Sequence, residues 1–433
     1  MFFVWSFYLL LVICIIQYLY TRSKVSTNGD AKFRQFQIEY LLVYLLAVAG
    51  DWLQGPHVYA LYDSYGMTKH EIELLFVAGF ASSLIFGTFI ASIADKYGRR
   101  SNCLLYSLLY GVACITIHFS NFWILTIGRI FSGISTSVLC SAFESWLIFE
   151  HNKRGFSKDL LSTVFSHAAL GNSVVAIICG VIAQYAADIF GYVAPFDVSL
   201  AVLIMMAFCA MFCWTENYGS EKVILSEQFI NAFNAIKNGK LLYKQMTQCE
   251  KVFLDQKILC LGLIQSLFEG AMYMFVLQWT PSLSDAYNGM VSHGYIFASF
   301  MVAVMIGSTI FRLIIKYQRP DSFLRFVLLL SAFCLITPTI WPKEAVIIFV
   351  AFILFEICIG IFWPAMGVMR GIYIHENTRA TIMNFCRIPL NIIVIIILLQ
   401  NLSRQNIFYC CAVFMVFASI IQQYLFQRFT LSV

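Results

Sequence analysis

Long apolar runs separated by short polar stretches fill most of the chain, and they predict membrane-spanning helices. Each run is about 20 residues long, the length that a helix needs to cross the hydrocarbon layer of a bilayer. The ten-residue alternation of barrel strands does not occur. Thirteen apolar segments can be marked along the sequence: 1–20, 38–62, 71–94, 101–119, 122–148, 162–187, 197–214, 257–280, 291–315, 322–340, 344–372, 380–400 and 406–427.

The first segment, residues 1–20, has to be weighed as a signal peptide or as a retained helix. Its apolar stretch is too long for a signal peptide, and no basic residue precedes it. The bulky residues Gln17, Tyr18 and Tyr20 occupy the place of a small-residue cleavage site. We therefore expect an N-terminal anchor helix that stays with the protein.

Polar stretches divide the other twelve segments into two groups of six. The longest polar stretch, residues 215–256, carries several lysines, and its part 227–243 has the periodicity of an amphipathic helix. This layout is typical of transporters built from two related halves. It predicts an all-α membrane protein organised as an anchor helix, a six-helix bundle, a linker and a second six-helix bundle: 1–20, 38–214, 215–256 and 257–428.

A weak internal repeat supports the two halves. The sequence EHNKR at 150–154 ends the fourth helix of the first half, and HENTR at 375–379 ends the fourth helix of the second half. Asp51 and Glu269 both lie near the middle of the first helix of their half. The offset along the chain between EHNKR and HENTR is similar to the offset between Asp51 and Glu269, which is what a duplicated bundle predicts.

Composition agrees with lipid as the main solvent. Hydrophobic residues make up 60% of the chain and charged residues only 12%, whereas soluble domains carry roughly 25% charged residues. Most of the fourteen cysteines lie inside apolar runs and no Cys-x-x-Cys pair occurs, so we expect buried thiols and no metal site. The net charge of +5 is too modest to indicate a nucleic-acid partner.

Lysine and arginine are distributed unevenly between the two sides of the predicted helices. The loops on one side contain only Lys69, Lys343 and Arg404, and the alternate loops hold nearly all other basic residues. Because positive charge favours the cytosolic side, we expect the N-terminus outside and the C-terminus in the cytosol.

One motif lies in the short turn between the second and third helices of the first half. Gly87 is followed by the run Asp95-Lys96-Tyr97-Gly98-Arg99-Arg100, and Arg129-x-x-x-Gly133 lies in the fourth helix. Both patterns resemble signature motifs of the major facilitator superfamily. The resemblance implies a cytosolic gate made by Asp95, Gly98, Arg99 and Arg100, and the position of Glu144 predicts an ion pair with Arg99 or Arg100.

A closer resemblance is carried by three longer stretches. GDWLQGPHVYALY (50–62), AFESWLIFEHNKRGF (142–156) and IGIFWPAMGVMRGIYIHENTRATIMNFCRIPLN (359–391) are similar to the eukaryotic molybdate-anion transporter family, a branch of that superfamily. The likeness covers residues 38–395, and an extra N-terminal helix is in keeping with it. It implies the major facilitator fold and a plasma-membrane carrier for molybdate, a tetrahedral oxyanion.

Charged side chains within the predicted helices need a reason, because each costs ~3 kcal/mol or more at the centre of a bilayer. At 1.5 Å per residue, a depth of about 10–20 Å follows for five of them. We expect these five to face a polar passage at the level where such carriers bind their substrates: Asp51, Glu269, Glu356, Arg129 and Arg387.

Charge separates the predicted roles. Arginine offers a rigid fork of donors that fits an oxyanion, so Arg129 and Arg387 are predicted to bind the anion. Neutral donors beside them are expected from Asn384, Asn391 and Gln54. The three carboxylates would repel a dianion, and they are predicted to pair with arginine or to carry coupled protons.

Other interpretations stay open. The two arginines and Asp51 could serve only to brace helices, and a lining of carboxylate, Gln and Trp would also suit an organic solute such as a sugar. A non-transporting sensor with the same fold is a third possibility. An enzyme is not expected, because no nucleophile–base pair or phosphate-binding glycine loop stands out. No cofactor is predicted, and the protein is expected to be a monomer.

Overall fold

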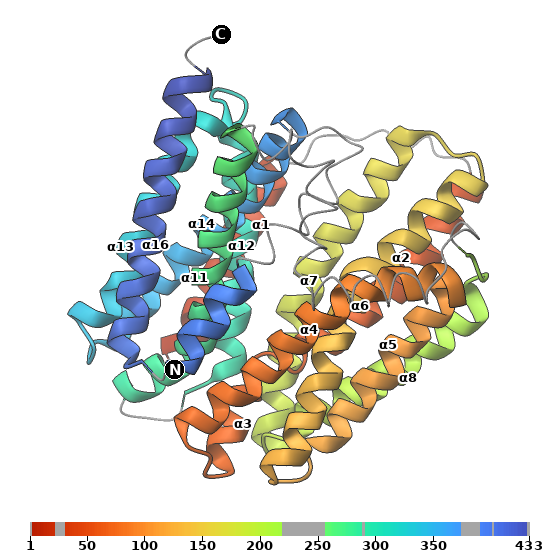
Figure 1. Cartoon of the computed structure of the whole chain (residues 1–433), viewed down its shortest axis with the longest axis horizontal. Coiled ribbons are helices and arrows are strands. Elements are labelled where there is room, and N and C mark those ends of the chain that lie inside the picture. The colour runs from red at the N-terminus through yellow and green to blue at the C-terminus, as the bar shows by residue number, and fades with distance from the viewer. Residues whose placement is uncertain are drawn as a thin grey trace, which may run out of the picture. The chain divides into compact units, whose positions relative to one another are not determined.

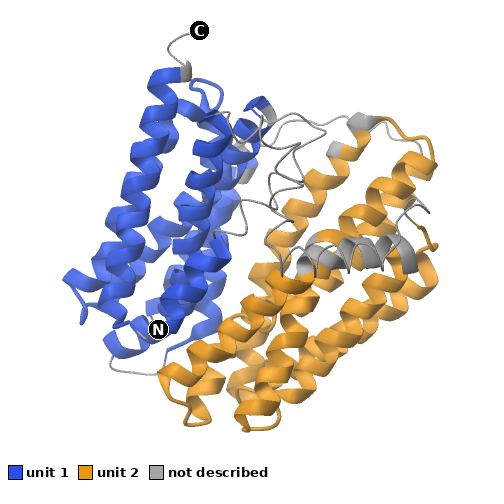
Figure 2. Ribbon diagram, viewed as in Figure 1, with its two compact units in different colours: residues 1–22, 242–433 blue, residues 23–241 orange. Residues whose placement is uncertain are grey.

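The structure, a computed structural model, describes residues 2–21, 31–218, 256–287, 291–373, 390–400 and 402–430. Within these ranges every regular element is a helix, so the predicted all-helical fold is confirmed (Figure 1). The chain divides into two compact units: residues 23–241 form one, and residues 1–22 with 242–433 form the other (Figure 2). We describe each unit by itself. The predicted amphipathic helix at 227–243 lies outside the described residues.

The unit of residues 23–241 contains seven described helices. They are α2 (Ala31–Trp52), α3 (Val58–Ser64), α4 (Lys69–Tyr97), α5 (Arg99–Thr116), α6 (Phe122–Lys153), α7 (Lys158–Phe190) and α8 (Ala194–Cys213). The continuous helix predicted over 38–62 is wrong, because residues 53–57 form turns between α2 and α3. Pro56 lies in this break and has no N–H to donate to the preceding turn, which favours an interruption there.

The second unit contains α11 (Gln256–Ala286), α12 (His293–Ile314), α13 (Pro320–Ile340), α14 (Ala345–Tyr373), α16 (Arg404–Leu425) and the short π-helix η1 (Phe426–Thr430). Residues 390–399 are also helical. The bounds of α11 to α14 and α16 agree with the predicted segments to within about six residues, because apolar runs of membrane length leave little choice of conformation. Residues 380–389 of the predicted segment 380–400 lie outside the described residues.

The N-terminal helix α1 (Phe2–Thr21) packs against α12 and so belongs to the second unit. The Phe3 ring lies 5.1 Å from that of Tyr287 and 5.2 Å from that of Phe349, measured between centroids. Phe7 lies 5.8 Å from Tyr295 in the same way. One face of α1 is thus buried by aromatic contacts, while Trp5 on its other face is 70% exposed.

Within the described part of the chain, eight helices are long and apolar enough to cross a membrane. Large apolar side chains point outward from them, including Trp123, Phe212 and Phe333. Such a surface would be unstable in water, and it fits hydrocarbon as the solvent of these helices. The protein is therefore a multi-pass membrane protein.

Glycine brings the second and fourth helices of each bundle together in the same way. A methyl group on Gly133 of α6 would overlap Ser82 Oγ and the carbonyl of Gly79 in α4. A methyl group on Gly360 of α14 would overlap the carbonyl of Val304 in α12. Small residues permit such close approach where lipid-facing helices pack. The two bundles repeat this contact, and Gly133 and Gly360 are 227 residues apart.

Candidate functional site

Asp51 and Tyr110 form the first polar pair of the bundle of residues 23–241. Asp51 lies one residue before the end of α2, and its Oδ1 accepts a hydrogen bond of 2.6 Å from the Tyr110 hydroxyl on α5. Tyr110 is buried, and the aspartate is half-buried. A buried hydrogen bond to a charged acceptor is among the stronger ones in proteins, so this pair fixes the position of the carboxylate.

Arg129 of α6 is the cation of the same bundle. Its guanidinium carbon lies 4.4 Å from the centroid of the Phe76 ring and 5.9 Å from that of Tyr62. The charge of Arg129 also acts on Asp51. Yet Arg129 has no hydrogen bond or ion pair with any described residue, and its Nε is buried without a partner. Cation–π contacts hold this arginine in place and leave its five donors unused.

Tyr62 of α3 adds a second unused polar group beside Arg129. The side chain is fully buried, and its hydroxyl has no hydrogen-bond partner in the described part of the chain. An orphaned buried hydroxyl costs free energy. Tyr62 and Arg129 therefore both carry donors that have no acceptor among the described residues.

Two side chains around the break between α2 and α3 have partners within the bundle. The Trp52 indole donates to Asn172 Oδ1 of α7 at 2.7 Å. The Gln54 amide donates to the carbonyl of Gly50 at 3.1 Å and to Ser199 Oγ of α8 at 2.9 Å. Both amide hydrogens of Gln54 are therefore engaged, and this residue fastens the turn of residues 53–57 to α8.

The second unit has its own buried polar cluster. Gln265 of α11 donates to Glu269 Oε1 at 2.6 Å, and Arg370 Nη1 of α14 donates to Gln265 Oε1 at 3.4 Å. Glu269 and Gln265 are almost completely buried. The glutamine thus links a cation on α14 to an acid on α11.

Glu356, in the middle of α14, is a different case. It is 5% exposed, and it makes no hydrogen bond or ion pair with the described residues. Of the remaining predicted residues, Asn391 is half-buried in the helical stretch 390–399. Arg387 and Asn384 lie outside the described residues.

The predicted gate region at the turn between α4 and α5 contains a carboxylate that the sequence did not suggest. Glu216, just after α8, accepts hydrogen bonds from the backbone N–H groups of Arg100 at 2.8 Å and Ser101 at 3.1 Å. It therefore caps the first turn of α5, where free N–H groups and the helix dipole favour negative charge. Gly98 has a φ of +103°, and a Cβ there would lie 2.5 Å from the Glu216 carboxyl carbon.

The arginines of this turn have partners other than the one predicted. Arg100 Nε lies 3.6 Å from Glu216 Oε2, and Arg99 Nη1 donates to the carbonyl of Ser145. Glu144 is exposed and forms no ion pair with them in the described structure. The side chain of Asp95 lies outside what the structure describes.

Sequence reasoning missed Tyr62, Tyr110, Gln265, Arg370 and Glu216. The two tyrosines and the glutamine carry no charge, so the free-energy cost of placing a charge in the membrane did not point to them. Arg370 and Glu216 lie near helix ends, where charge is common. The pattern Trp214-Thr-Glu216-Asn217 directly after an apolar run was the available signal for the cap.

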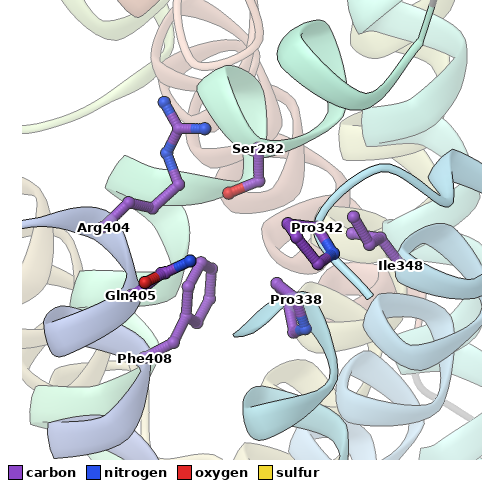
Figure 3. A pocket seen from close by; sticks show the side chains of 7 residues that line it. All are labelled: Ser282, Pro338, Pro342, Ile348, Arg404, Gln405 and Phe408. Carbon is purple, nitrogen blue, oxygen red and sulfur yellow. The ribbon is translucent and has the colours of Figure 1, made fainter. Parts of the chain in front are cut away.

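Two hollows lie apart from these residues. One, of about 120 Å³, is formed in the second unit by Ser282, Pro338, Pro342, Ile348, Arg404, Gln405 and Phe408 (Figure 3). Arg404 Nη1 donates to Asp285 Oδ2 at 2.6 Å beside it. The other, of about 640 Å³, is a mostly apolar groove between α5 and α8. Within the described ranges, no group of three or more His, Cys, Asp or Glu side chains could hold a metal ion.

Solved structures support the architecture. A D-xylose–proton symporter superposes with a TM-score of 0.67, covering 91% of this chain and 97% of that protein at 9% identity. A peptide transporter crystallised with sulfate gives a TM-score of 0.70 over 94% of this chain and 96% of that protein at 12% identity. At these identities the likeness concerns the fold.

Sequence relatives are closer. A family model described as sugar transporters with twelve transmembrane segments matches residues 2–351. The molybdate-anion transporter of Xenopus tropicalis is 32% identical, over 93% of this chain and 89% of the relative. That of Takifugu rubripes is also 32% identical, over 89% and 84%. The resemblance seen in the sequence is thus confirmed, and the chain belongs to the major facilitator superfamily, in the family of the molybdate-anion transporters.

Proposed function

We propose that this protein carries molybdate, or a related tetrahedral oxyanion, into the cell by alternating access. The observation that supports this most is Arg129, a cation inside a membrane-spanning bundle whose donors have no acceptor among the described residues. A protein keeps such a charge in the membrane when a function requires it. The molybdate-anion transporters among its relatives give the oxyanion as the substrate class.

The surroundings of Arg129 suit an anion of this kind. The cation–π contact with Phe76 holds the guanidinium without using any of its N–H groups. The Tyr62 ring centroid lies 5.9 Å from the guanidinium carbon, and its unpartnered hydroxyl is proposed as a further donor. Tyr110 holds the Asp51 carboxylate by a hydrogen bond, and no direct ion pair joins this aspartate to the arginine in the described structure. A dianion that enters would gain several charge-assisted hydrogen bonds.

Further ligands, the coupled ion and the orientation in the membrane are proposed from the sequence. Arg387, Asn384 and Asn391 are proposed as further ligands from the second half, and protons as the coupled ions. We place the protein in the cell membrane as a monomer, with the N-terminus outside and the C-terminus in the cytosol, because basic residues gather in alternate loops. The turn of Gly98, Arg100 and Glu216 would then lie on the cytosolic side as a gate element.

A carrier of an organic solute is the second candidate. The matching family model is described as sugar transporters, and Trp52 with Asn172 forms a polar aromatic pair that a sugar could contact. A sensor that has lost transport is the third. These candidates differ in what the protein moves, so a transport assay separates them.

The test is uptake of radiolabelled molybdate into cells that lack their own molybdate uptake. The oxyanion carrier predicts saturable uptake that tungstate and sulfate inhibit and that xylose does not. Inhibition by sugars and not by oxyanions would favour the organic-solute carrier. Normal surface expression with no uptake of any tested solute would favour the sensor, and either of these outcomes would contradict the proposal.

A further inference from the structure

Arg129 and Glu356 occupy the same position in the two bundles. Arg129 lies four residues before Gly133, where α6 meets α4, and Glu356 lies four residues before Gly360, where α14 meets α12. Residues four apart lie on the same face of a helix. The two charged positions are 227 residues apart, as are the two glycines. One position of the repeat therefore holds a cation in the first bundle and an acid in the second.

Arg129 and Glu356 differ in whether they can lose their charge when they are buried. An arginine stays charged in proteins, whereas a carboxylic acid can become neutral by binding a proton. Glu356 is 5% exposed. An ionised carboxylate sealed in a helical bundle without a partner is strongly unfavourable. In this bundle the neutral acid is the form that avoids the cost.

Glu356 is distinguished from the other two acids by its lack of a partner. Asp51 accepts a hydrogen bond from Tyr110, and Glu269 accepts one from Gln265. These bonds stabilise the ionised form of both acids. Glu356 has no equivalent bond in the part of the chain that the structure describes.

The helices packed on α14 supply no compensating charge. The charged and titratable acidic or basic side chains of the described helices that contact α14 are Lys257, Glu269 and Asp285 on α11, His293 and Arg312 on α12, Asp321 and Arg325 on α13, and Arg404 on α16; α1 has none. Several are bonded elsewhere: Asp285 to Arg404, Arg312 to Thr309, Asp321 to Tyr373 and Arg325 to Gln423. In the described structure, none of these side chains forms a hydrogen bond or an ion pair with Glu356. Because no described cation offsets an ionised Glu356, we expect this acid to become neutral by binding a proton.

We propose that Glu356 is the residue that carries the coupled proton during uptake, an inference that rests on the proposed function as an oxyanion carrier. Glu356 binds a proton from the outer solution and holds it while the bundle is sealed. It releases the proton to the cytosol when alternating access exposes the side chain to water on that side. One proton then enters with each anion through this residue, and it offsets part of the anion's negative charge.

The test uses purified protein in liposomes, with radiolabelled molybdate as the probe. Uptake is measured with and without an inward proton gradient, and exchange of labelled for unlabelled molybdate is measured at equal pH. The variants are Glu356→Gln, which resembles the protonated acid, Glu356→Asp, which keeps a carboxyl group, and Glu344→Gln. Glu344 is exposed, directly before α14, and provides the same chemical change as a control.

We expect the gradient to stimulate uptake by the wild type, by Glu356→Asp and by the control. Glu356→Gln should lose the stimulation and keep exchange. Stimulation of Glu356→Gln by the gradient, equal to that of the wild type, would overturn the inference. Loss of molybdate exchange by Glu356→Gln would also overturn it, because it would indicate a structural role. Wild-type uptake that ignores the gradient would also overturn it. Absence of both uptake and exchange in the wild type would instead contradict the proposed function.

Discussion

Tyr110 of α5 donates its hydroxyl hydrogen to Asp51 of α2 over 2.6 Å, and in the described structure the acid forms no ion pair with Arg129 of α6. The charge of Arg129 still acts on Asp51. Three helices of one bundle thus place an acid, a phenol and a cation close together while leaving the cation's donors free. The proposed anion site depends on this arrangement.

Replacing Tyr110 with Phe should therefore disturb transport. Without the hydroxyl, the Asp51 carboxylate loses its hydrogen bond and becomes free to pair with Arg129, which would compete with the anion. We expect the KM for molybdate uptake to rise, and the free energy of unfolding to fall by about 1.5 kcal/mol. Uptake kinetics and thermal unfolding in detergent measure the two effects.

Tyr106→Phe is the matched control for that variant. Tyr106 lies on the same helix and donates to the carbonyl of Ala47 in α2 at 2.8 Å, so it also bonds α5 to α2. Its loss should lower stability by about 1 kcal/mol and leave the KM unchanged. Equal KM values for Tyr110→Phe and Tyr106→Phe would contradict the role given to Asp51.

Tyr62→Phe removes a hydroxyl that has no partner in the described structure. Deleting an unsatisfied buried hydroxyl should leave stability unchanged or slightly raise it. If the hydroxyl donates to the bound anion, the KM for molybdate should rise about tenfold, as for a lost hydrogen bond to a charged group. A stable variant with an unaltered KM would exclude Tyr62 from the binding site.

Gly98→Ala tests the cap of α5. The new methyl group would lie 2.5 Å from the Glu216 carboxyl carbon, at a backbone φ of +103°. Both the strain and the collision with the capping carboxylate destabilise the turn, together by about 2–3 kcal/mol. The melting temperature and the amount of protein at the cell surface should both fall.

Gly155→Ala separates these two causes. Gly155 also has a positive φ, of +72°, but no atom lies within 4 Å of the position where its Cβ would be placed. It should suffer only the backbone strain, about 1 kcal/mol. Equal losses for the two variants would show that contact with Glu216 adds nothing to the stability of the turn.

The close approach of α14 to α12 gives a further prediction. Gly360→Ala would push a methyl group into the carbonyl of Val304, and the helices would have to separate. We expect a loss of about 1–3 kcal/mol, as for overpacking of a core. Gly367→Ala in the same helix meets no atom within 4 Å and should gain up to about 1 kcal/mol from helix propensity. Similar melting temperatures for both variants would contradict the repeated glycine contact.

Hydrophobic run length predicted the fold well, because in lipid each backbone must satisfy its own hydrogen bonds and helices follow directly from apolar segments. The break at residues 53–57 was missed since Gln54 and Pro56 interrupt the run only briefly. The packing of α1 on α12 could not be predicted from the sequence either. It depends on which side chains meet, such as Phe3 and Tyr287, and a pattern of hydrophobicity carries no such information.

The candidate site could be predicted only in part. The sequence singled out Asp51, Arg129, Glu269 and Glu356 as candidates because a charge in the membrane is costly wherever it lies. The partner of Asp51, Tyr110, and that of Glu269, Gln265, are uncharged. They become recognisable only in the folded structure. The expected pairing of Glu144 failed because Glu216, 72 residues further along the chain, reaches Arg100 through the fold.

Equilibrium binding of radiolabelled molybdate to the purified protein tests the central claim most directly. The wild type and the control Arg428→Gln, at an exposed arginine near the C-terminus, should bind molybdate saturably, with tungstate competing. Arg129→Gln should lose at least about tenfold in affinity, since a charge-assisted fork is removed. Equal affinities for the wild type and Arg129→Gln would contradict the account.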